Sequence, residues 1–280
     1  MSSLTAITPE KPLLLIGCGK MGGAMLAGWL KEGLNGNAVH IVDPFLEPIK
    51  SAFPNFSLDN LHEAVDGLPN GITPSFVIMA VKPQMMDEAL SNLKENDLSA
   101  TVIMSVAAGK TIHYFEDHLS REHAIVRAMP NTPAAIGRGI TVCVANTPVT
   151  VAQKKICTIL LETVSTVEWI DDESLMDAVT ALSGSGPAYV FYMAEAMAAA
   201  GEAIGLPEEL SKKLARQTVS GAGALLDASS ERTSKLRENV TSPGGTTAAA
   251  LDVLMSEDGI AKIMRRAMQE AKNRSKELAG

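Results

Sequence analysis

Cysteine is scarce in this chain of 280 residues, which contains only Cys18, Cys143 and Cys157. None of the three lies in a CxxC pair or at metal-ligand spacing, so the sequence indicates neither a metal site nor a disulfide framework. Long apolar runs are missing as well, since none approaches the roughly 20 residues that cross a bilayer. The beginning of the chain lacks the charged region and the long apolar segment of a signal peptide. We therefore expect a soluble cytoplasmic protein with reduced thiols, no bound metal and no membrane contact.

Positive charge is in short supply too. The chain has 24 Lys and Arg against 32 Asp and Glu, which gives a formal net charge of -8. This balance argues against nucleic acid as a partner, because bulk attraction to a polyanion needs the opposite sign. An anionic ligand must then be bound locally, through backbone N–H groups or a few placed side chains. The hydrophobic content of 46% is ample for a core.

The first part of the chain alternates short β-rich runs with helical stretches. The runs are nearly continuous in apolar residues, as expected for strands whose two faces are both covered by helices. They occupy residues 13–16, 39–42, 76–81, 102–106, 125–129, 140–145 and 166–170. Alternation of strands and helices predicts a parallel, doubly wound α/β sheet of the Rossmann type.

After Asp171 the strand-like runs disappear and helical spacing takes over. Apolar or small residues recur on one helical face in residues 210–225 and again in residues 260–271. We therefore predict two domains, with the sheet in residues 1–170 and helices alone in residues 171–280. Exposed helical faces of this kind would form large apolar patches, which suggests at least a dimer.

A GxGxxG match, with the sequence GCGKMG, lies between the first predicted strand and a helical segment. In that place Gly17 permits a tight turn, Gly19 lets a pyrophosphate approach the backbone, and Gly22 allows close helix–sheet packing. Lys20 and Met21 open the helix, whose N-terminus favours an anion. The motif therefore predicts a dinucleotide cofactor, and a glycine turn without a ligand is the alternative.

Asp43 ends the second predicted strand, 21 residues beyond Gly22. An acid at this place usually accepts hydrogen bonds from the adenosine ribose and disfavours a 2′-phosphate, which favours NADH over NADPH. The preference is modest, because Lys50 is near in sequence and Pro44 can redirect the loop. Capping of the following turn by Asp43 is the alternative.

Two later strand ends carry small residues at the edge where open α/β sheets bind ligands. Ala80 and Val81 end one strand just before Lys82, and Ala107 and Ala108 follow another. Small side chains there allow a flat nicotinamide or a ribose to approach. Lys82 is either part of this cofactor edge or a solvated surface charge.

Three further segments suggest a substrate site. In the segment MPNTP two prolines fix the backbone around Asn131, which makes either a rigid polar loop or a plain turn. Glycines in residues 182–189 interrupt a helical run, for close packing or for approach of the nicotinamide or substrate. Residues 242–247, SPGGTT, precede a helical run and offer backbone N–H groups and hydroxyls together. That combination suits a carboxylate without Arg or Lys, and plain N-capping by Thr246 is the alternative.

Segments along nearly the whole chain resemble the pyrroline-5-carboxylate reductase family. In family order they read IGCGKMGGAML, AVKPQ, SVAAGKTI, RAMPNTP, ALSGSGPAYVF and LRENVTSPGGTTAAAL, of which the last is the most specific. The resemblance implies a Rossmann domain followed by an all-α dimerisation domain. It also implies homodimers that often assemble into decamers, as pentamers of dimers. The implied activity is reduction of 1-pyrroline-5-carboxylate to L-proline by NADH or NADPH.

The resemblance implies roles for individual residues as well. The substrate carboxylate would be bound by Ser242, Gly245, Thr246 and Thr247. Thr180 would lie near the substrate nitrogen and Asn239 near the nicotinamide, although Asn239 could equally close a turn. Lys82, Ala107 and Asn60 would contact the cofactor, the last on its adenosine side.

This chain departs from the family pattern after the second strand. Many members that favour NADPH carry small polar and basic residues there, whereas this chain has Val42, Asp43 and Pro44. Residues 67–74 also resemble a local insertion, which affects the assignment of Asn60.

The expected chemistry needs no strong general acid. A cyclic imine is basic enough to be partly protonated near neutral pH, so hydride attacks an iminium. We therefore take Thr180 and Thr247 as the catalytic candidates, with Thr180 bonding the ring nitrogen or holding a water that does so. Two alternatives stay open: an imine reductase for another cyclic imine acid, such as a six-membered one, and a non-catalytic nucleotide-binding protein on the same fold.

Overall fold

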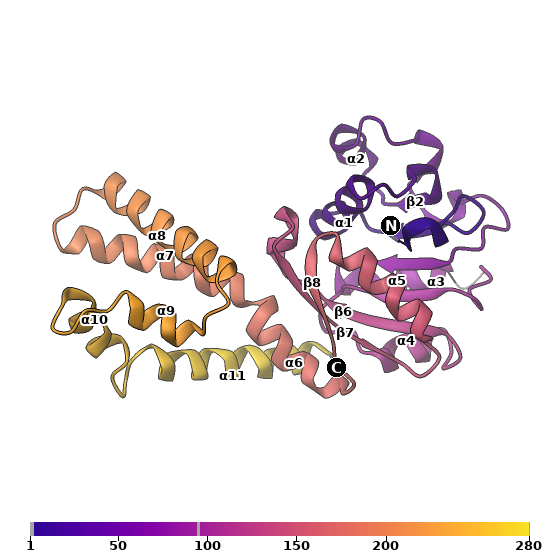
Figure 1. Cartoon of the computed structure of the whole chain (residues 1–280). Helices are drawn as coiled ribbons and strands as arrows, with labels where there is room; N and C mark the ends of the chain where they lie inside the picture. Colours follow the sequence, from indigo (N-terminus) through magenta and orange to yellow (C-terminus); the bar gives the residue numbers. More distant parts are fainter. Residues whose placement is uncertain (1–2, 94–95, 280) are drawn as a thin grey trace. The chain divides into compact units, whose positions relative to one another are not determined.

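A computed structural model gives the fold and describes residues 3–93 and 96–279 (Figure 1). The chain divides into two compact units. The first unit runs to Gly184 and includes the end of the chain from Lys272, and the second unit is Ser185–Ala271. The division after Gly184 comes later than the domain boundary expected at residue 170.

A single eight-stranded sheet forms the centre of the first unit, in the order β3-β2-β1-β4-β5-β6-β7-β8. Neighbouring strands pair in parallel, except β6 with β7, which pair antiparallel. The predicted fold class, a doubly wound α/β sheet followed by helices, is confirmed. The strands are β1 Leu13–Ile16, β2 Val39–Val42, β3 Leu61–His62, β4 Phe76–Met79, β5 Val102–Ser105, β6 Ala124–Met129, β7 Gly139–Ala145 and β8 Ser165–Trp169.

Two features of the sheet differ from the expectation. The edge strand β3 has only two residues, too short a run to leave an apolar pattern in the sequence. The strand β7 is antiparallel to β6, although a wholly parallel sheet was expected. The connection between them contains only the short 3-10 helix Thr132–Ile136, and a parallel crossover needs a dozen residues or more.

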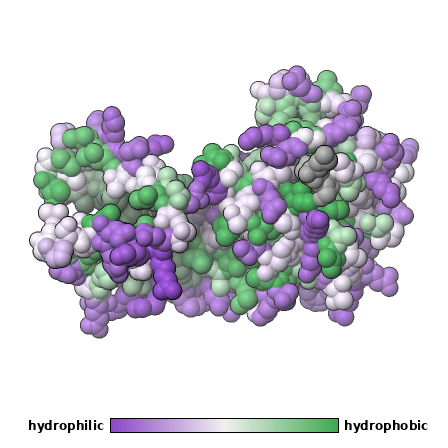
Figure 2. Space-filling view, viewed as in Figure 1, coloured by the Kyte–Doolittle hydropathy of each residue, from purple (hydrophilic) through white to green (hydrophobic). Residues whose placement is uncertain are grey.

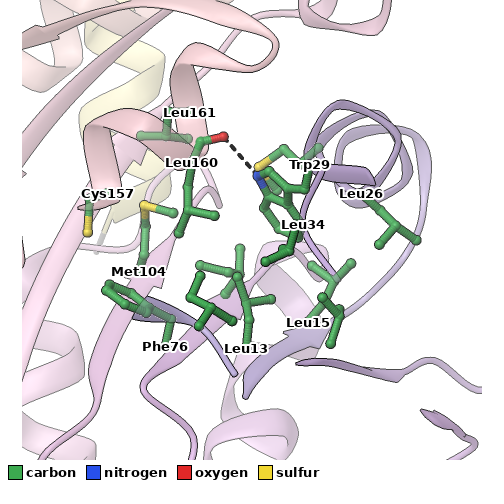
Figure 3. Packing of buried hydrophobic residues seen from close by; sticks show 14 of the residues in the cluster. Leu13, Leu15, Leu26, Trp29, Leu34, Phe76, Met104, Cys157, Leu160 and Leu161 are labelled. Carbon is green, nitrogen blue, oxygen red and sulfur yellow. Dashed lines mark hydrogen bonds between the residues drawn. The ribbon is translucent and has the colours of Figure 1, made fainter. Parts of the chain in front are cut away.

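Helices cover both faces of the sheet, which explains why β1 and β4 are apolar throughout. All four residues of β1 are buried, and they alternate between two separate core clusters. On one face the helices α1 (Lys20–Lys31) and α5 (Val151–Glu162) pack against Leu13 and Leu15. The indole of Trp29 donates a hydrogen bond to the carbonyl of Leu160 at 2.8 Å (Figure 3). On the other face the helices α3 (Met86–Leu93), α4 (Ile112–His118) and α6 (Met176–Val179) pack against Leu14 and its neighbours.

The helices of the first unit are short. They are α1 Lys20–Lys31, α2 Leu46–Ala52, α3 Met86–Leu93, α4 Ile112–His118, α5 Val151–Glu162 and α6 Met176–Val179. A π-helical turn, Thr180–Gly184, follows α6 and ends the first of the two stretches that make up the unit. Turns of this kind occur frequently at functional sites.

The second unit consists of helices, as the sequence predicted. They are α7 Gly186–Ala203, α8 Glu208–Ala228, α9 Thr233–Asn239, α10 Thr246–Leu254 and α11 Ile260–Ala279, the last of which ends in the first unit. α7 and α8 lie side by side and approach closely at Gly201, where an added Cβ would meet the Ser211 hydroxyl at 2.8 Å (Figure 1). In the described part of the chain, no helix has the length and apolar character to cross a membrane.

Candidate functional site

A cavity of about 380 Å³ opens at the carboxyl ends of β1, β2 and β4. β1 lies between β2 and β4 in the sheet, so the winding of the chain reverses at this point. In open α/β sheets, ligands bind where the winding reverses. The cavity is lined by Ile16, Gly17, Gly19, Val42, Asp43, Pro44, Phe45, Glu63, Ala64, Val65, Ala80, Val81, Lys82, Met85, Glu88, Ala89 and Asn92.

The three glycines of the first turn meet different surroundings. Gly17 has φ +90°, a left-handed conformation, and an added Cβ would meet the backbone of Ala80 at 2.9 Å. A Cβ on Gly22 would lie 2.2 Å from the carbonyl oxygen of Gly17, which is far inside contact distance. A Cβ on Gly19 would meet nothing within 4 Å. The chain itself therefore requires Gly17 and Gly22, whereas Gly19 leaves open space for a ligand.

The N-terminus of α1 is arranged to receive an anion. Gly19 is the N-cap residue and has no side chain to bond the first N–H groups of the helix. Lys20, the first helical residue, is exposed, and Met21 packs in part against the core. These features fit the pyrophosphate of a dinucleotide, whose charge suits free N–H groups at a helix N-terminus.

Asp43 occupies a central place in the cavity wall. Its Oδ2 accepts a hydrogen bond from the backbone N–H of Cys18 at 2.7 Å, and its Oδ1 accepts one from the N–H of Phe45 at 2.9 Å. The carboxylate therefore ties the glycine turn to the turn after β2, so capping of the following turn does occur. Burial, together with the charge of Asp43, raises the pKa of the Cys18 thiol to about 12, so this thiol stays protonated at neutral pH.

Some of the other predicted cofactor residues line the cavity, and some do not. Ala80, Val81 and Lys82 follow β4 and line the same cavity as Gly17 and Asp43. Ala107 and Ala108 follow β5 and are not among its lining residues. The N–H of Ala107 donates to the hydroxyl of Ser105 at 3.2 Å, which fixes the start of that loop.

Asn60 is buried and is not among the residues that line the cavity. Its amide nitrogen donates to three backbone carbonyls, those of Gly36, Asn37 and Val39, at 3.3, 3.2 and 2.9 Å. The amide thus holds the turn that leads into β2. This structural role of Asn60 was not predicted from the sequence, and the predicted adenosine contact stays a prediction.

Two acids of the cavity, Glu63 and Glu88, were not predicted from the sequence. Glu63 directly follows the two-residue strand β3, and Glu88 lies in α3. Neither belongs to a motif, and the only available signal was the position of Glu63 beyond an unrecognised strand. In residues 3–93 and 96–279, no group of three or more His, Cys, Asp or Glu side chains is placed to hold a metal ion.

Asn131 and Thr180, predicted on separate segments, meet at the π-helical turn. The amide nitrogen of Asn131 donates to the carbonyl of Ser183 at 3.2 Å, and its oxygen accepts from the N–H of Ile140 at 3.0 Å. The Thr180 hydroxyl donates to the carbonyl of Met176 at 2.8 Å, which leaves its lone pairs free to accept. Asn131 therefore joins the loop after β6 and the strand β7 to the turn that carries Thr180.

The remaining candidates lie in the second unit. Gly244 has φ +67°, and Gly245 is the N-cap residue of α10, again without a side-chain cap. Thr246 is the first residue of the helix and not its cap, so the N-capping expected as the alternative is not observed. Thr247 follows in the same first turn, and Ser242 accepts the N–H of Gly245 at its carbonyl at 3.0 Å. The segment thus presents uncapped N–H groups and two hydroxyls at one helix start.

Asn239 ends α9, a few residues before this segment. Its amide nitrogen donates to the carboxylate of Glu231 at 3.0 Å. Both residues belong to the second unit. The hydrogen bond closes the stretch that contains α9, in line with the turn-closing alternative for Asn239.

We call the cavity lined by Gly17 and Gly19 the glycine-turn cavity. The fold and this cavity define a Rossmann-type dinucleotide-dependent oxidoreductase. Residues 13–109 match the family model described as NADP oxidoreductase coenzyme F420-dependent. Residues 173–278 match the model described as pyrroline-5-carboxylate reductase dimerisation.

Comparison with individual proteins gives the family. The chain is 34% identical to a pyrroline-5-carboxylate reductase of Pseudomonas aeruginosa, over 95% of this chain and 96% of that one. A reductase structure from Coxiella burnetii matches with a TM-score of 0.87 and 33% identity, over 97% of this chain and 99% of that one. A Plasmodium falciparum pyrroline carboxylate reductase with NADP bound matches with a TM-score of 0.80 and 30% identity, over 96% and 98%. The chain belongs to the pyrroline-5-carboxylate reductase family, whose members act on a C=N bond.

Proposed function

We propose that this protein reduces 1-pyrroline-5-carboxylate to L-proline, with NADH or NADPH as the hydride donor. The observation that carries the proposal is the glycine-turn cavity, in a chain that aligns over 95% of its length with a relative named for this reaction. The free amide end of α1 and the open space at Gly19 support binding of a dinucleotide.

The residues that would hold the nucleotide belong to the first unit. Gly17, Gly19 and Gly22, with Lys20 and Met21, form the turn and the helix start for the pyrophosphate. Asp43, Ala80, Val81 and Lys82 line the rest of the cavity. Ala107 and Ala108 extend the same edge of the sheet past β5, and Asn239 is assigned near the nicotinamide by family resemblance. When bound, the reduced nicotinamide supplies the hydride.

The substrate carboxylate would be bound at the start of α10. Ser242, Gly245, Thr246 and Thr247 offer backbone N–H groups and hydroxyls where the helix dipole favours a negative charge. A carboxylate held this way needs no lysine or arginine. Thr247 thereby fixes the acid group of the substrate. Because this segment carries no positive charge, it does not oppose protonation of the imine nitrogen.

Thr180 would act on the imine nitrogen as a hydrogen-bond acceptor. Its own proton is given to the carbonyl of Met176, so its oxygen can accept the N–H of a protonated imine. In this role Thr180 stabilises the iminium and orients the ring without supplying a proton. Asn131 contributes to the substrate side through the turn that it holds.

We also propose that the protein works in the cytoplasm as a homodimer formed by its helical unit, with a pentamer of dimers as the full assembly. The three cysteines are free thiols, as suits a reducing compartment. The dimer is supported by the family of the helical region and by the apolar residues on the surface of its helices (Figure 2). The proposed pentamer of dimers rests on family resemblance alone.

A direct assay tests the proposed reaction. NADH or NADPH oxidation is followed with and without 1-pyrroline-5-carboxylate, and proline is identified as the product. A six-membered cyclic imine acid serves as the competing substrate. Faster turnover of the six-membered ring would assign the protein to the wider class of imine reductases, and no turnover of either would leave a nucleotide-binding protein without catalysis.

The variant Thr247→Ala tests the carboxylate site. It should raise KM for the imine acid by about tenfold, the scale expected for loss of one hydrogen bond to a charged group, while KM for the nucleotide changes little. Unchanged kinetics for the imine acid would remove this segment from the site.

A further inference from the structure

The ends of β2 and β3 place two acids side by side at the cavity. These strands pair in parallel, with Val42 opposite His62, and the N–H of Asp43 donates to the carbonyl of His62 at 3.0 Å. Asp43 and Glu63 each follow directly after this pair. Both line the cavity that receives the nucleotide.

The two carboxylates differ in the hydrogen bonds that they already accept. Each oxygen of Asp43 already accepts a backbone N–H, from Cys18 and from Phe45. Glu63 is exposed, and its side chain has no hydrogen bond or ion pair within residues 3–93 and 96–279. Asp43 is therefore fixed within the wall and keeps one further acceptor site on each oxygen, whereas both oxygens of Glu63 are wholly available to a ligand.

The charge of the wall disfavours a further anion at this end. Asp43, Glu63 and Glu88 carry negative charge, and among the lining residues that the structure describes Lys82 is the one cation. Lys50, the cation that follows β2 in sequence, is paired with Glu47 at 2.7 Å. A 2′-phosphate would bring a charge of about -1.5 to -2 to a wall that is already acidic.

We propose that Glu63 is a specificity-determining residue that accepts a hydrogen bond from the adenosine ribose and excludes the 2′-phosphate of NADPH. Asp43 is the positioning residue that holds the two turns of the wall in place. Carboxylates that bond ribose hydroxyls are the general means by which Rossmann proteins select NADH. The inference rests on the proposed function, in that the ligand of the cavity is a nicotinamide nucleotide.

The test measures nucleotide binding without the imine acid. Dissociation constants for NADH and NADPH are obtained by fluorescence titration of the full chain and of the variants Glu63→Gln and Asp66→Asn. Asp66 is a matched control, because it is an exposed acid of the same segment and does not line this cavity. The wild type should bind NADH at least tenfold more tightly than NADPH. Glu63→Gln should reduce that ratio about tenfold, as expected for loss of one charged hydrogen bond, and Asp66→Asn should preserve it.

Tighter binding of NADPH than of NADH by the wild type would overturn the inference. So would an equal shift of the ratio in Glu63→Gln and Asp66→Asn, which would reduce the effect to net charge. Selective NADH binding without reduction of 1-pyrroline-5-carboxylate would refute the proposed reaction and leave the role of Glu63 standing.

Discussion

Gly19 and Gly22 belong to one turn, yet Gly22 is tightly enclosed by its neighbours and Gly19 is not. A Cβ on Gly22 would lie 2.2 Å from the carbonyl oxygen of Gly17, so Gly22→Ala must push the helix away from the sheet. Overpacking of this kind costs about 1–3 kcal/mol of the free energy of unfolding. Gly19→Ala meets no atom within 4 Å and has φ -69°, which alanine adopts freely. It should leave stability within about 0.5 kcal/mol and weaken nucleotide binding at least tenfold.

Thermal unfolding and nucleotide titration of the two variants separate these effects. Gly22→Ala should lower the melting temperature of the apoprotein, whereas Gly19→Ala should lower only the affinity. An unaltered affinity in Gly19→Ala would mean that the pyrophosphate does not approach this glycine.

The buried pair His40 and His62 makes stability depend on pH. The two rings stack, with His40 Nδ1 and His62 Nε2 3.0 Å apart. Burial lowers the pKa of both imidazoles below the ordinary 6.5. The neighbouring His62 lowers that of His40 further, and a hydrogen bond to the backbone of Gly67 partly opposes the shift at His62. The unfolded chain therefore takes up protons near pH 6.5, while the folded protein takes them up only at lower pH. The contribution to stability is complete above pH 6.5 and is lost as the pH falls below it.

Melting temperatures at pH 7 and pH 5 measure this linkage. The decrease on acidification should be larger in the wild type than in His62→Gln by about 2–4 °C. Glutamine keeps an acceptor near the position of Nε2 and removes one titrating ring. His113→Gln, at an exposed position, should retain the full decrease. If His62→Gln and the wild type lose the same amount, the pair does not govern the acid sensitivity.

At the scale of elements, the amide of Asn131 helps to hold the π-helical turn Thr180–Gly184 from another segment. Asn131→Asp keeps the oxygen that accepts from Ile140 and loses the N–H donor to Ser183. The turn should then relax and misplace Thr180. We expect kcat to fall about tenfold, a change of about 1.4 kcal/mol in the barrier, while KM for the nucleotide stays within about twofold.

Asn146 provides a matched control for this prediction. Its oxygen accepts from the N–H of Ile125 at 2.8 Å and its nitrogen donates to the carbonyl of His123 at 2.9 Å, a similar arrangement at another place in the sheet. The same nitrogen also donates to the carboxylate of Glu116 at 3.3 Å. Asn146→Asp should therefore lose at least as much stability as Asn131→Asp and keep kcat within about twofold of the wild type. Equal losses of kcat in the two variants would reduce Asn131 to a general support of the fold.

Elements with a strong local pattern were predictable, and elements defined by pairing were not. β1 and β2 have the ends that the apolar runs indicated. β3 has two residues, and β7 runs antiparallel to β6 because the connection between them is short. Neither feature can be recognised from the spacing of apolar residues in the sequence. Among the candidate residues, the glycine turn was visible as a motif. Glu63 was not, because its place at the cavity follows from the pairing of β3 with β2.

At the scale of the whole molecule, the helical unit lacks a core of its own. Within Ser185–Ala271, all of which is described, Ala198 and Ala215 are the apolar residues that are buried. Larger side chains are exposed, among them Phe191 at 63% and Val253 at 71%. Burial of apolar area is the main term that stabilises a fold, so small buried residues alone would leave these helices marginal. The missing cover is expected to come from a second copy of the same unit.

An oligomer of this kind has a stability that depends on concentration, because association favours the folded state by mass action. The melting temperature of the wild type should therefore rise with protein concentration, and sedimentation should show a dimer or a multiple of it. Leu214→Glu places a charge on the exposed apolar face of α8, which also carries Leu210 one turn earlier. It should shift the protein towards monomers and lower its melting temperature. Lys155→Glu, at an exposed position of α5 in the first unit, should change neither property. A wild-type monomer that unfolds at the same temperature over a hundredfold dilution would contradict the argument, since the apolar helices would then be stable without a partner.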